Sequence, residues 1–181
     1  MKKPEDTEDK KKWIKYGEEK EREFINKIAP KLDMDARINP KKKNEPTTID
    51  MIVDGRLTDL KYKNEPFYLS KKIYGIEPEN CITFDTIDYR RYCHYDNLDV
   101  IFWVDWNKKR NYGVTVQEVK GVWKMNFEKI KINIENKCYP KHKYKKRKND
   151  PINSQSSYLL DLEDMVCIKN FKEKETLDFF I

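Results

Sequence analysis

Asp50, Asp59 and Lys61 lie close together in the stretch TTIDMIVDGRLTDLKY, and side chains of these types can support phosphate chemistry. Two β-rich runs flank the Asp54-Gly55 step, which is a strong signal for a β-hairpin. A two-residue turn at this step places Asp50 directly opposite Asp59, with Cβ atoms about 4.5–5.5 Å apart. Lys61 follows two positions after Asp59 and therefore projects from the same face of its strand.

Two opposed carboxylates repel each other, which destabilises the pair and raises the pKa of one of them. A hard divalent cation between them removes that repulsion, and Mg²⁺ commonly takes carboxylates, backbone carbonyls and phosphate oxygens as ligands. A lysine beside it could orient or help deprotonate an attacking water, or stabilise charge on a phosphate. The plainer interpretation is a solvated hairpin face with Lys61 as a salt-bridge partner. A glutamate-rich helix upstream favours the chemical interpretation, as do the apolar residues of the hairpin, which are Ile49, Met51, Ile52, Val53, Leu57 and Leu60.

The order of these motifs resembles the PD-(D/E)XK nuclease superfamily, which has a helix with a glutamate, an aspartate on one strand and an acid-x-lysine on the next. The corresponding segments are GEEKEREFI at 17–25, TID at 48–50 and DLK at 59–61. The first segment is similar to the opening helix of the Holliday-junction-resolvase branch. Two features depart from the family pattern: Thr48 and Ile49 occupy the region of the eponymous proline, and aspartate replaces the commoner glutamate in DLK.

The resemblance covers residues 13–106 and implies an α/β fold with a restriction-endonuclease-like core, in which helices flank a central mixed β-sheet. It implies a metal-dependent endonuclease that hydrolyses DNA phosphodiester bonds with Mg²⁺, for which Mn²⁺ can substitute. Matched residue by residue, it assigns catalytic roles to Glu21, Asp50, Asp59 and Lys61. The expected metal ligands are Asp50, Asp59, the backbone carbonyl of Leu60, and Glu21.

Alternatives stay open both for the inward acid of the helix and for the function, which has two further possibilities beside the nuclease. Glu18, Glu19 and Glu23 compete with Glu21 as the inward acid of the helix, and Glu18 shares its side. The same fold could also lack activity and serve as an adaptor that binds nucleic acid or joins an assembly. A protein that docks a partner without binding DNA is the third possibility.

Composition narrows the class of protein. The 181 residues carry 38 Lys+Arg and 32 Asp+Glu, so the net charge is +6 and a polyanion such as DNA fits as the partner. An aromatic content of 13% argues against general disorder. The chain has no apolar run of the roughly 20 residues that span a bilayer, no signal peptide at residues 1–12, and too few cysteines for a disulfide framework. We therefore expect a cytoplasmic protein without membrane association, while a phage or mobile-element origin and a homodimer stay open.

Basic residues outside the hairpin are candidates for contacts with DNA phosphates. The run KHKYKKRK at 141–148 could follow a phosphate backbone, although such runs are more often simply solvated. The candidate nucleic-acid-binding residues are Lys71, Lys72, Arg90, Lys143, Lys145, Lys146 and Arg147. Structural zinc is excluded because the cysteines and histidines lack the spacing of zinc ligands.

The pattern predicts a charged tail at 1–12 and one nuclease-like domain over 13–181 with a basic loop at 137–149. Its first expected elements are a helix over 13–32 limited by Pro30, the hairpin within 47–62, an irregular segment at 63–80 and a short strand at 81–84. A helix capped by Asp85 follows, with Ile87, Tyr92 and Tyr95 on one side. A buried strand over 98–106 then pairs with a strand over 112–120 through a turn at 107–111, and a last helix or strand begins at Ser156 or Ser157. Residues 121–135 are left unassigned.

Overall fold

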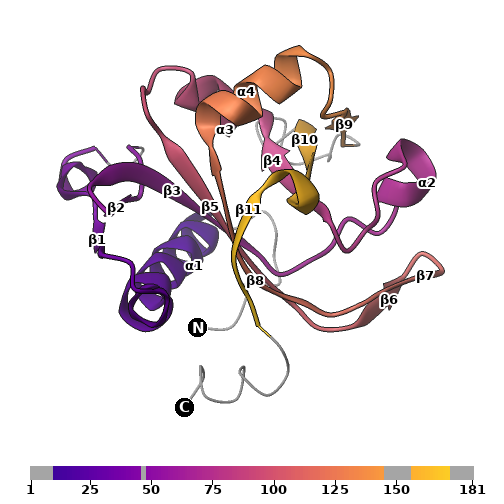
Figure 1. Cartoon of the computed structure of the whole chain (residues 1–181), viewed down its shortest axis with the longest axis horizontal. Coiled ribbons are helices and arrows are strands. Elements are labelled where there is room, and N and C mark those ends of the chain that lie inside the picture. Colours follow the sequence, from indigo (N-terminus) through magenta and orange to yellow (C-terminus); the bar gives the residue numbers. More distant parts are fainter. Residues whose placement is uncertain (1–9, 46–47, 145–155, 172–181) are drawn as a thin grey trace.

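The computed structural model describes residues 10–45, 48–144 and 156–171, whose path Figure 1 traces. The helices are α1 (Lys10–Glu23), α2 (Ser70–Tyr74), α3 (Thr86–Tyr92) and α4 (Phe127–Glu135). The strands are β1 (Ala36–Ile38), β2 (Met51–Val53), β3 (Arg56–Lys63), β4 (Cys81–Asp85), β5 (Asp99–Trp106), β6 (Lys109–Asn111), β7 (Val114–Val116), β8 (Val119–Asn126), β9 (Lys141–Lys143), β10 (Ser156–Asp161) and β11 (Val166–Asn170). A π-helical turn (Phe24–Ile28) continues α1, and 3₁₀ turns are formed by Ala29–Leu32, Pro40–Lys43 and Leu162–Asp164.

Six strands form a central mixed sheet in the order β1-β2-β3-β5-β8-β11. In the described sheet β3 and β5 run parallel, and the other neighbouring strands run antiparallel. A parallel pair needs a long connection, and the chain between β3 and β5 contains α2, β4 and α3. Figure 1 shows α1 on one side of this sheet and α3 and α4 on the other. The expected α/β class with a mixed sheet between helices is therefore confirmed.

Alternate residues of the central strands feed two hydrophobic cores, one on each face of the sheet. On one face Trp103 of β5 packs with Phe24, which follows α1. On the other face Phe102 of β5 packs in one cluster with Tyr92 of α3 and Phe127 of α4. The apolar run of β5 is thus buried on both sides, as a central strand between two helical layers requires.

The hairpin forms at the predicted step. Asp54 and Gly55 have φ angles of 49° and 78°, so both turn residues adopt the left-handed conformation of a type I′ turn. The backbone N–H of Asp54 also donates to the carbonyl of Asp35, 2.8 Å away, which ties the turn to the segment before β1. The opposed pairs are Val53 with Arg56, Ile52 with Leu57, and Met51 with Thr58. The predicted register is therefore confirmed.

Three expectations about elements are wrong, the first being the basic loop at 137–149, in which Lys141–Lys143 form β9 because they pair with β10. The partner of β5 is β8, whereas residues 114–116 pair with 109–111 as the separate β6–β7 hairpin that extends from the sheet in Figure 1. The reason is a second tight turn, at Tyr112 and Gly113, where both residues have positive φ. Ile87 of α3 is 49% exposed, because Tyr92 rather than Ile87 lies on the packed side of that helix.

The remaining segments complete the described chain. α2 falls within the stretch expected to be irregular, and β8 and α4 occupy the stretch left unassigned. Ser156 opens a strand, β10, which lies between β4 and β9 in a small second sheet. All four cysteines lie in the described residues and are free. Within the same residues we find no helix with the length and apolar character that a membrane span requires.

Candidate active site

The register of the hairpin brings the two candidate aspartates together. Continued by one residue beyond Met51–Thr58, it places Asp50 opposite Asp59 on one face. β2 begins at Met51, directly after Asp50, and the backbone N–H of Leu60 donates to Oδ2 of Asp50 at 3.3 Å. The Asp50 side chain therefore caps the end of the ladder and remains close to the Asp59 carboxylate.

Asp59 is completely buried. Neither of its carboxylate oxygens meets strict hydrogen-bond geometry with a described residue, but the Lys61 ammonium lies 2.9 Å from Oδ2 as an ion pair, and polar contacts with Lys61 and with the Tyr92 hydroxyl lower the pKa of Asp59. Burial raises the pKa of Asp59 to about 6, and the nearby Asp50 charge adds to this rise while Lys61 opposes it. The fold thus holds a carboxylate that is poorly satisfied in the dry interior.

Helix α3 supplies two charged groups that sequence reasoning did not assign to the site. The Lys61 ammonium also lies 2.7 Å from Oδ2 of Asp88, and Arg91 lies 3.0 Å from Oδ1 of Asp88 and 3.8 Å from Oδ1 of Asp59. Burial alone would lower the pKa of Lys61, but Asp59 and the other acids hold it well above its ordinary value. Lys61 is therefore a fixed cation. The spacing of Asp88 and Arg91, one helical turn apart, was the available sequence signal.

Glu21 of α1 approaches the pair through a second lysine. The Lys42 ammonium lies 2.7 Å from Oδ1 of Asp50 and 2.7 Å from Oε2 of Glu21. Burial works to lower the pKa of Lys42, but Asp50 and Glu21 raise it above its ordinary value. Glu21 is the buried acid among the four candidates on its helix, because Glu18, Glu19 and Glu23 are less enclosed. Lys42 lies in the basic run NPKKKNEP at 39–46, and its spacing offered no signal for this role.

The alternation on β3 continues one step further. Lys63 lies on the same face as Asp59 and Lys61, and its ammonium donates to the Thr83 hydroxyl at 3.3 Å. Among the described residues it makes no ion pair, and burial lowers its pKa. An Asp-x-Lys-x-Lys pattern was present in the sequence and could have suggested this residue.

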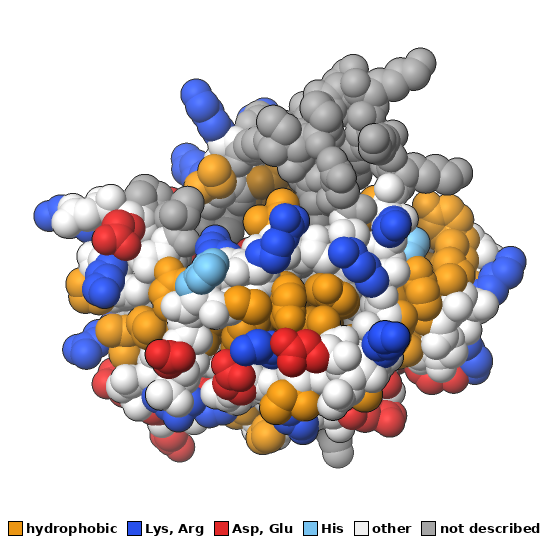
Figure 2. Space-filling model, turned by 90° about the horizontal axis from the view of Figure 1, so that it is seen from above, with side chains coloured by type: hydrophobic (Ala, Val, Ile, Leu, Met, Phe, Trp, Pro, Cys, Tyr) orange, Lys and Arg blue, Asp and Glu red, His pale blue; other side chains and the backbone are white. Residues whose placement is uncertain are grey.

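The expected DNA-binding residues lie apart from these acids. Lys71 and Lys72 are exposed on α2, where Lys71 pairs with Glu77 at 2.7 Å. Arg90 is exposed, and its neighbour Arg91 is the arginine of α3 that faces the acids. Lys143 is exposed on β9, whereas Lys145, Lys146 and Arg147 lie outside the described residues. Seen from the side of α3 and α4, Figure 2 shows basic side chains distributed over the face around a central group of apolar ones.

The acids of the candidate site form ion pairs with two different lysines: Glu21 and Asp50 with Lys42, and Asp59 and Asp88 with Lys61. Within the described part of the chain, no three acidic, histidine or cysteine side chains converge as ligands of one ion. Asp50 and Asp59 are nevertheless hard oxygen donors on one face, and the Asp59 oxygens lack aligned donors. Carboxylates in this state suit a divalent cation such as Mg²⁺.

Comparisons with known proteins add no assignment. No family model matches this chain, and no match was found among the curated proteins or the solved structures.

Proposed function

We propose that the protein is a metal-dependent endonuclease that hydrolyses DNA phosphodiester bonds and that its sheet is a restriction-endonuclease-like core. The observation that carries the proposal is the buried Asp59 carboxylate, which lies close to the Asp50 charge, pairs with a fixed lysine on the same face and has no strictly aligned hydrogen bond to a described residue. The order of the resembling motifs supports it, because the glutamate lies on α1, the first aspartate directly before β2 and the acid-x-lysine on β3.

The residues that would hold Mg²⁺ are Asp50, Asp59 and the backbone carbonyl of Leu60, with Glu21 nearby on α1. The poorly satisfied oxygens of Asp59 fit this assignment, since a bound cation offsets the penalty of burying a carboxylate. When bound, such an ion polarises the phosphate and lowers the pKa of water.

Lys61 then acts as a positioned cation. Its pKa is held above the ordinary value, so it is poorly suited to accept a proton at neutral pH. It can instead donate hydrogen bonds that orient the attacking water and stabilise negative charge on the phosphate. Asp88 also pairs with the Lys61 ammonium, at 2.7 Å, and so helps to fix its position beside Asp59.

The test is cleavage of plasmid and branched DNA with Mg²⁺ or Mn²⁺ added. Asp50→Asn and Asp59→Asn should each lower the rate about a thousandfold or more, because each removes a carboxylate from the cation. Asp96→Asn changes an exposed aspartate outside the cluster and is the matched control. Nicking that is equally fast in all four proteins, or absent in all of them, would refute the nuclease proposal.

One observation favours the second candidate, an adaptor of the same fold without activity. Glu21 and Asp50 already share the Lys42 ammonium, and Asp59 and Asp88 share that of Lys61. The charges are therefore compensated without an added ion. Salt-sensitive DNA binding that persists in every metal condition without nicking would support the adaptor.

A further inference from the structure

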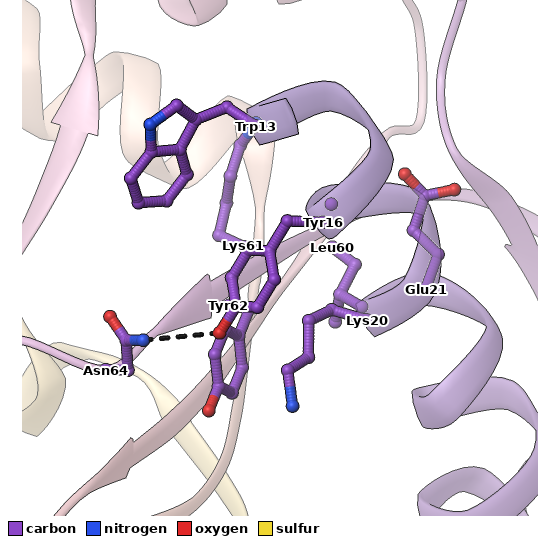
Figure 3. A pocket seen from close by; sticks show the side chains of 9 residues that line it. Trp13, Tyr16, Lys20, Glu21, Leu60, Lys61, Tyr62 and Asn64 are labelled. Atoms are coloured by element: carbon purple, nitrogen blue, oxygen red, sulfur yellow. Dashed lines mark hydrogen bonds between the residues drawn. The ribbon is translucent and has the colours of Figure 1, made fainter. Parts of the chain in front are cut away.

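A pocket adjoins the candidate active site on the side of α1. Its volume is about 190 Å³, and Figure 3 shows the side chains that line it. The pocket is open to solvent and shares Glu21, Leu60 and Lys61 with the candidate active site. The other lining residues are Trp13, Tyr16, Gly17, Lys20, Tyr62 and Asn64.

The aromatic walls of the pocket are held in place. The Tyr16 hydroxyl accepts a hydrogen bond from the Asn64 amide at 3.4 Å, and the Tyr62 hydroxyl donates to Asp105 at 3.1 Å. The Trp13 and Tyr16 rings meet edge to face, with centroids 5.8 Å apart. In Figure 3 Trp13 and Glu21 lie on opposite sides of the tyrosine rings, and the Glu21 carboxylate is turned away from them. Such rigid aromatic surfaces lose little freedom when a flat ligand packs on them.

Gly17 of α1 lines this pocket. It lies inside α1, where glycine is less favourable than alanine, yet neither its φ angle nor a close neighbour requires glycine. A Cβ built at this position meets no atom within 4 Å. The space next to Gly17 is therefore free for a ligand, and a larger side chain would enter it.

We propose that this pocket binds one unstacked nucleobase of a DNA strand whose phosphate reaches Lys61, an inference that rests on the proposed function. The pocket is smaller than the roughly 300–1,000 Å³ typical for drug-sized ligands, which matches a single base better than a larger molecule. Trp13 is the ring on which a base can stack, because Tyr16 is only 8% exposed and the Lys20 ammonium lies 4.5 Å from the centroid of the Tyr62 ring. The Asn64 amide offers polar groups at the rim. Because a paired base is stacked within its duplex, the pocket selects a single-stranded, frayed or branched substrate.

The charge distribution along α1 agrees with a strand that passes the pocket. Its first two turns have the sequence KKKWIK, and no acid lies in the first turn, although the helix dipole disfavours cations there. Lys11 and Lys15 are exposed. Phosphates of a bound strand would offset this unfavourable arrangement.

The experiment measures binding without catalysis, in buffer that contains a metal chelator. The probes are short DNAs of one length: a single strand with 2-aminopurine, the blunt duplex of the same sequence, and a strand of abasic sugar phosphates. Gly17→Leu fills the pocket, and Gly17→Ala adds only a Cβ into open space and serves as the matched control. Gly17→Leu should weaken binding of the single strand about tenfold and abolish the quenching of 2-aminopurine, whereas Gly17→Ala and duplex binding should not change.

Trp13→Ala is a second variant that opens the pocket instead of filling it, and it should give the same loss. Tyr112→Ala removes a 72% exposed aromatic ring at the tip of the β6–β7 hairpin and should leave the quenching intact. Equal affinity for the abasic and intact strands, equal behaviour of Gly17→Leu and Gly17→Ala, or no binding of any probe would overturn the base pocket. If the wild-type protein cleaves no DNA in the nuclease test but these differences in binding are observed, the nuclease proposal is overturned and the base-binding pocket is not.

Discussion

Two lysine clusters in this protein use the same charges in different surroundings. The Lys42 cluster contains Glu21, Lys42 and Asp50, and its side chains are 11–17% exposed. The Lys61 cluster contains Asp59, Lys61, Asp88 and Arg91; its other side chains are 18–33% exposed, but that of Asp59 is only 1% exposed. In the first cluster the lysine donates hydrogen bonds to both acids. In the second, the oxygens of Asp59 lack an aligned donor.

This difference shows what distinguishes a carboxylate suited to binding a cation or a proton. The deciding features are its burial and the alignment of its hydrogen-bond donors, rather than the number of its ion pairs. A satisfied, partly hydrated pair joins two segments, here α1 and the 3₁₀ turn Pro40–Lys43. A buried and poorly satisfied carboxylate retains free energy that an added cation or a proton can release. The following predictions test this distinction between the clusters.

The largest expected effect is from Lys61→Met, compared with Lys42→Met. Lys61→Met should lower the free energy of unfolding by about 3–5 kcal/mol at pH 7.5, because it leaves Asp59 buried without its nearest cation. Lys42→Met should lower it by about 1–2 kcal/mol, because Glu21 and Asp50 retain some hydration. Urea unfolding measures both values. Equal losses in the two variants would mean that the clusters do not differ as described.

Asp59→Asn should stabilise the protein above pH 6. The folded protein binds a proton at Asp59 with a pKa of about 6, against 3.8 for an ordinary aspartate, so stability from this group is highest below pH 4 and decreases as the pH rises through 6. The whole change corresponds to roughly 3 kcal/mol. Unfolding of wild type and variant between pH 4 and 8 should therefore diverge with increasing pH. Parallel curves would show that the charge of Asp59 does not destabilise the folded protein.

Lys42→Met should also increase the affinity for divalent cations. The ammonium lies between two carboxylates that would otherwise face an added ion, so ion and ammonium compete. We expect Mn²⁺ to bind about tenfold more tightly, which equals about 1.4 kcal/mol, and calorimetry measures this without DNA. Glu45→Gln, at an exposed position shortly after the same turn, is the control. Unchanged affinity in Lys42→Met would place the ion away from the Lys42 cluster.

The smallest effect concerns salt. In 1 M NaCl the Debye length is about 3 Å, which weakens partly hydrated ion pairs more than buried ones. The loss of stability caused by Lys42→Met should therefore decrease by a few tenths of a kcal/mol on going from low to high salt. The loss caused by Lys61→Met should stay nearly constant. The reverse order would show that water reaches Asp59 more readily than the two lysine clusters suggest.

Local turn chemistry explains which features of the fold could be predicted. The Asp54-Gly55 step and the apolar alternation around it determine the hairpin and its register, since both act within a few residues. The partner of β5 could not be predicted in this way. Strand pairing across the sheet depends on which segments pack best on its two faces. β5 therefore pairs with β8 and not with the segment that follows it directly in the sequence.

The same limit applies to the candidate site. Glu21 could be proposed from the resemblance, but its burial depends on how α1 lies against the sheet. In the sequence, Asp88 is only one of several charged residues of a helix. The side of α3 that faces β3 depends on the packing of Tyr92 in the core, which the sequence did not reveal. Lys42 belongs to a basic run that resembles any solvated loop.

By itself, the sequence determined that Asp50, Asp59 and Lys61 share one face of a hairpin, because a two-residue turn and the two-residue period of a strand leave no other arrangement. Only the tertiary structure decided that Asp59 is dry, that Lys42 and Asp88 reach the acids, and that a pocket opens beside Lys61. Those properties depend on contacts between segments far apart in the chain, and such contacts are selected by the packing of the whole sheet rather than by any local pattern.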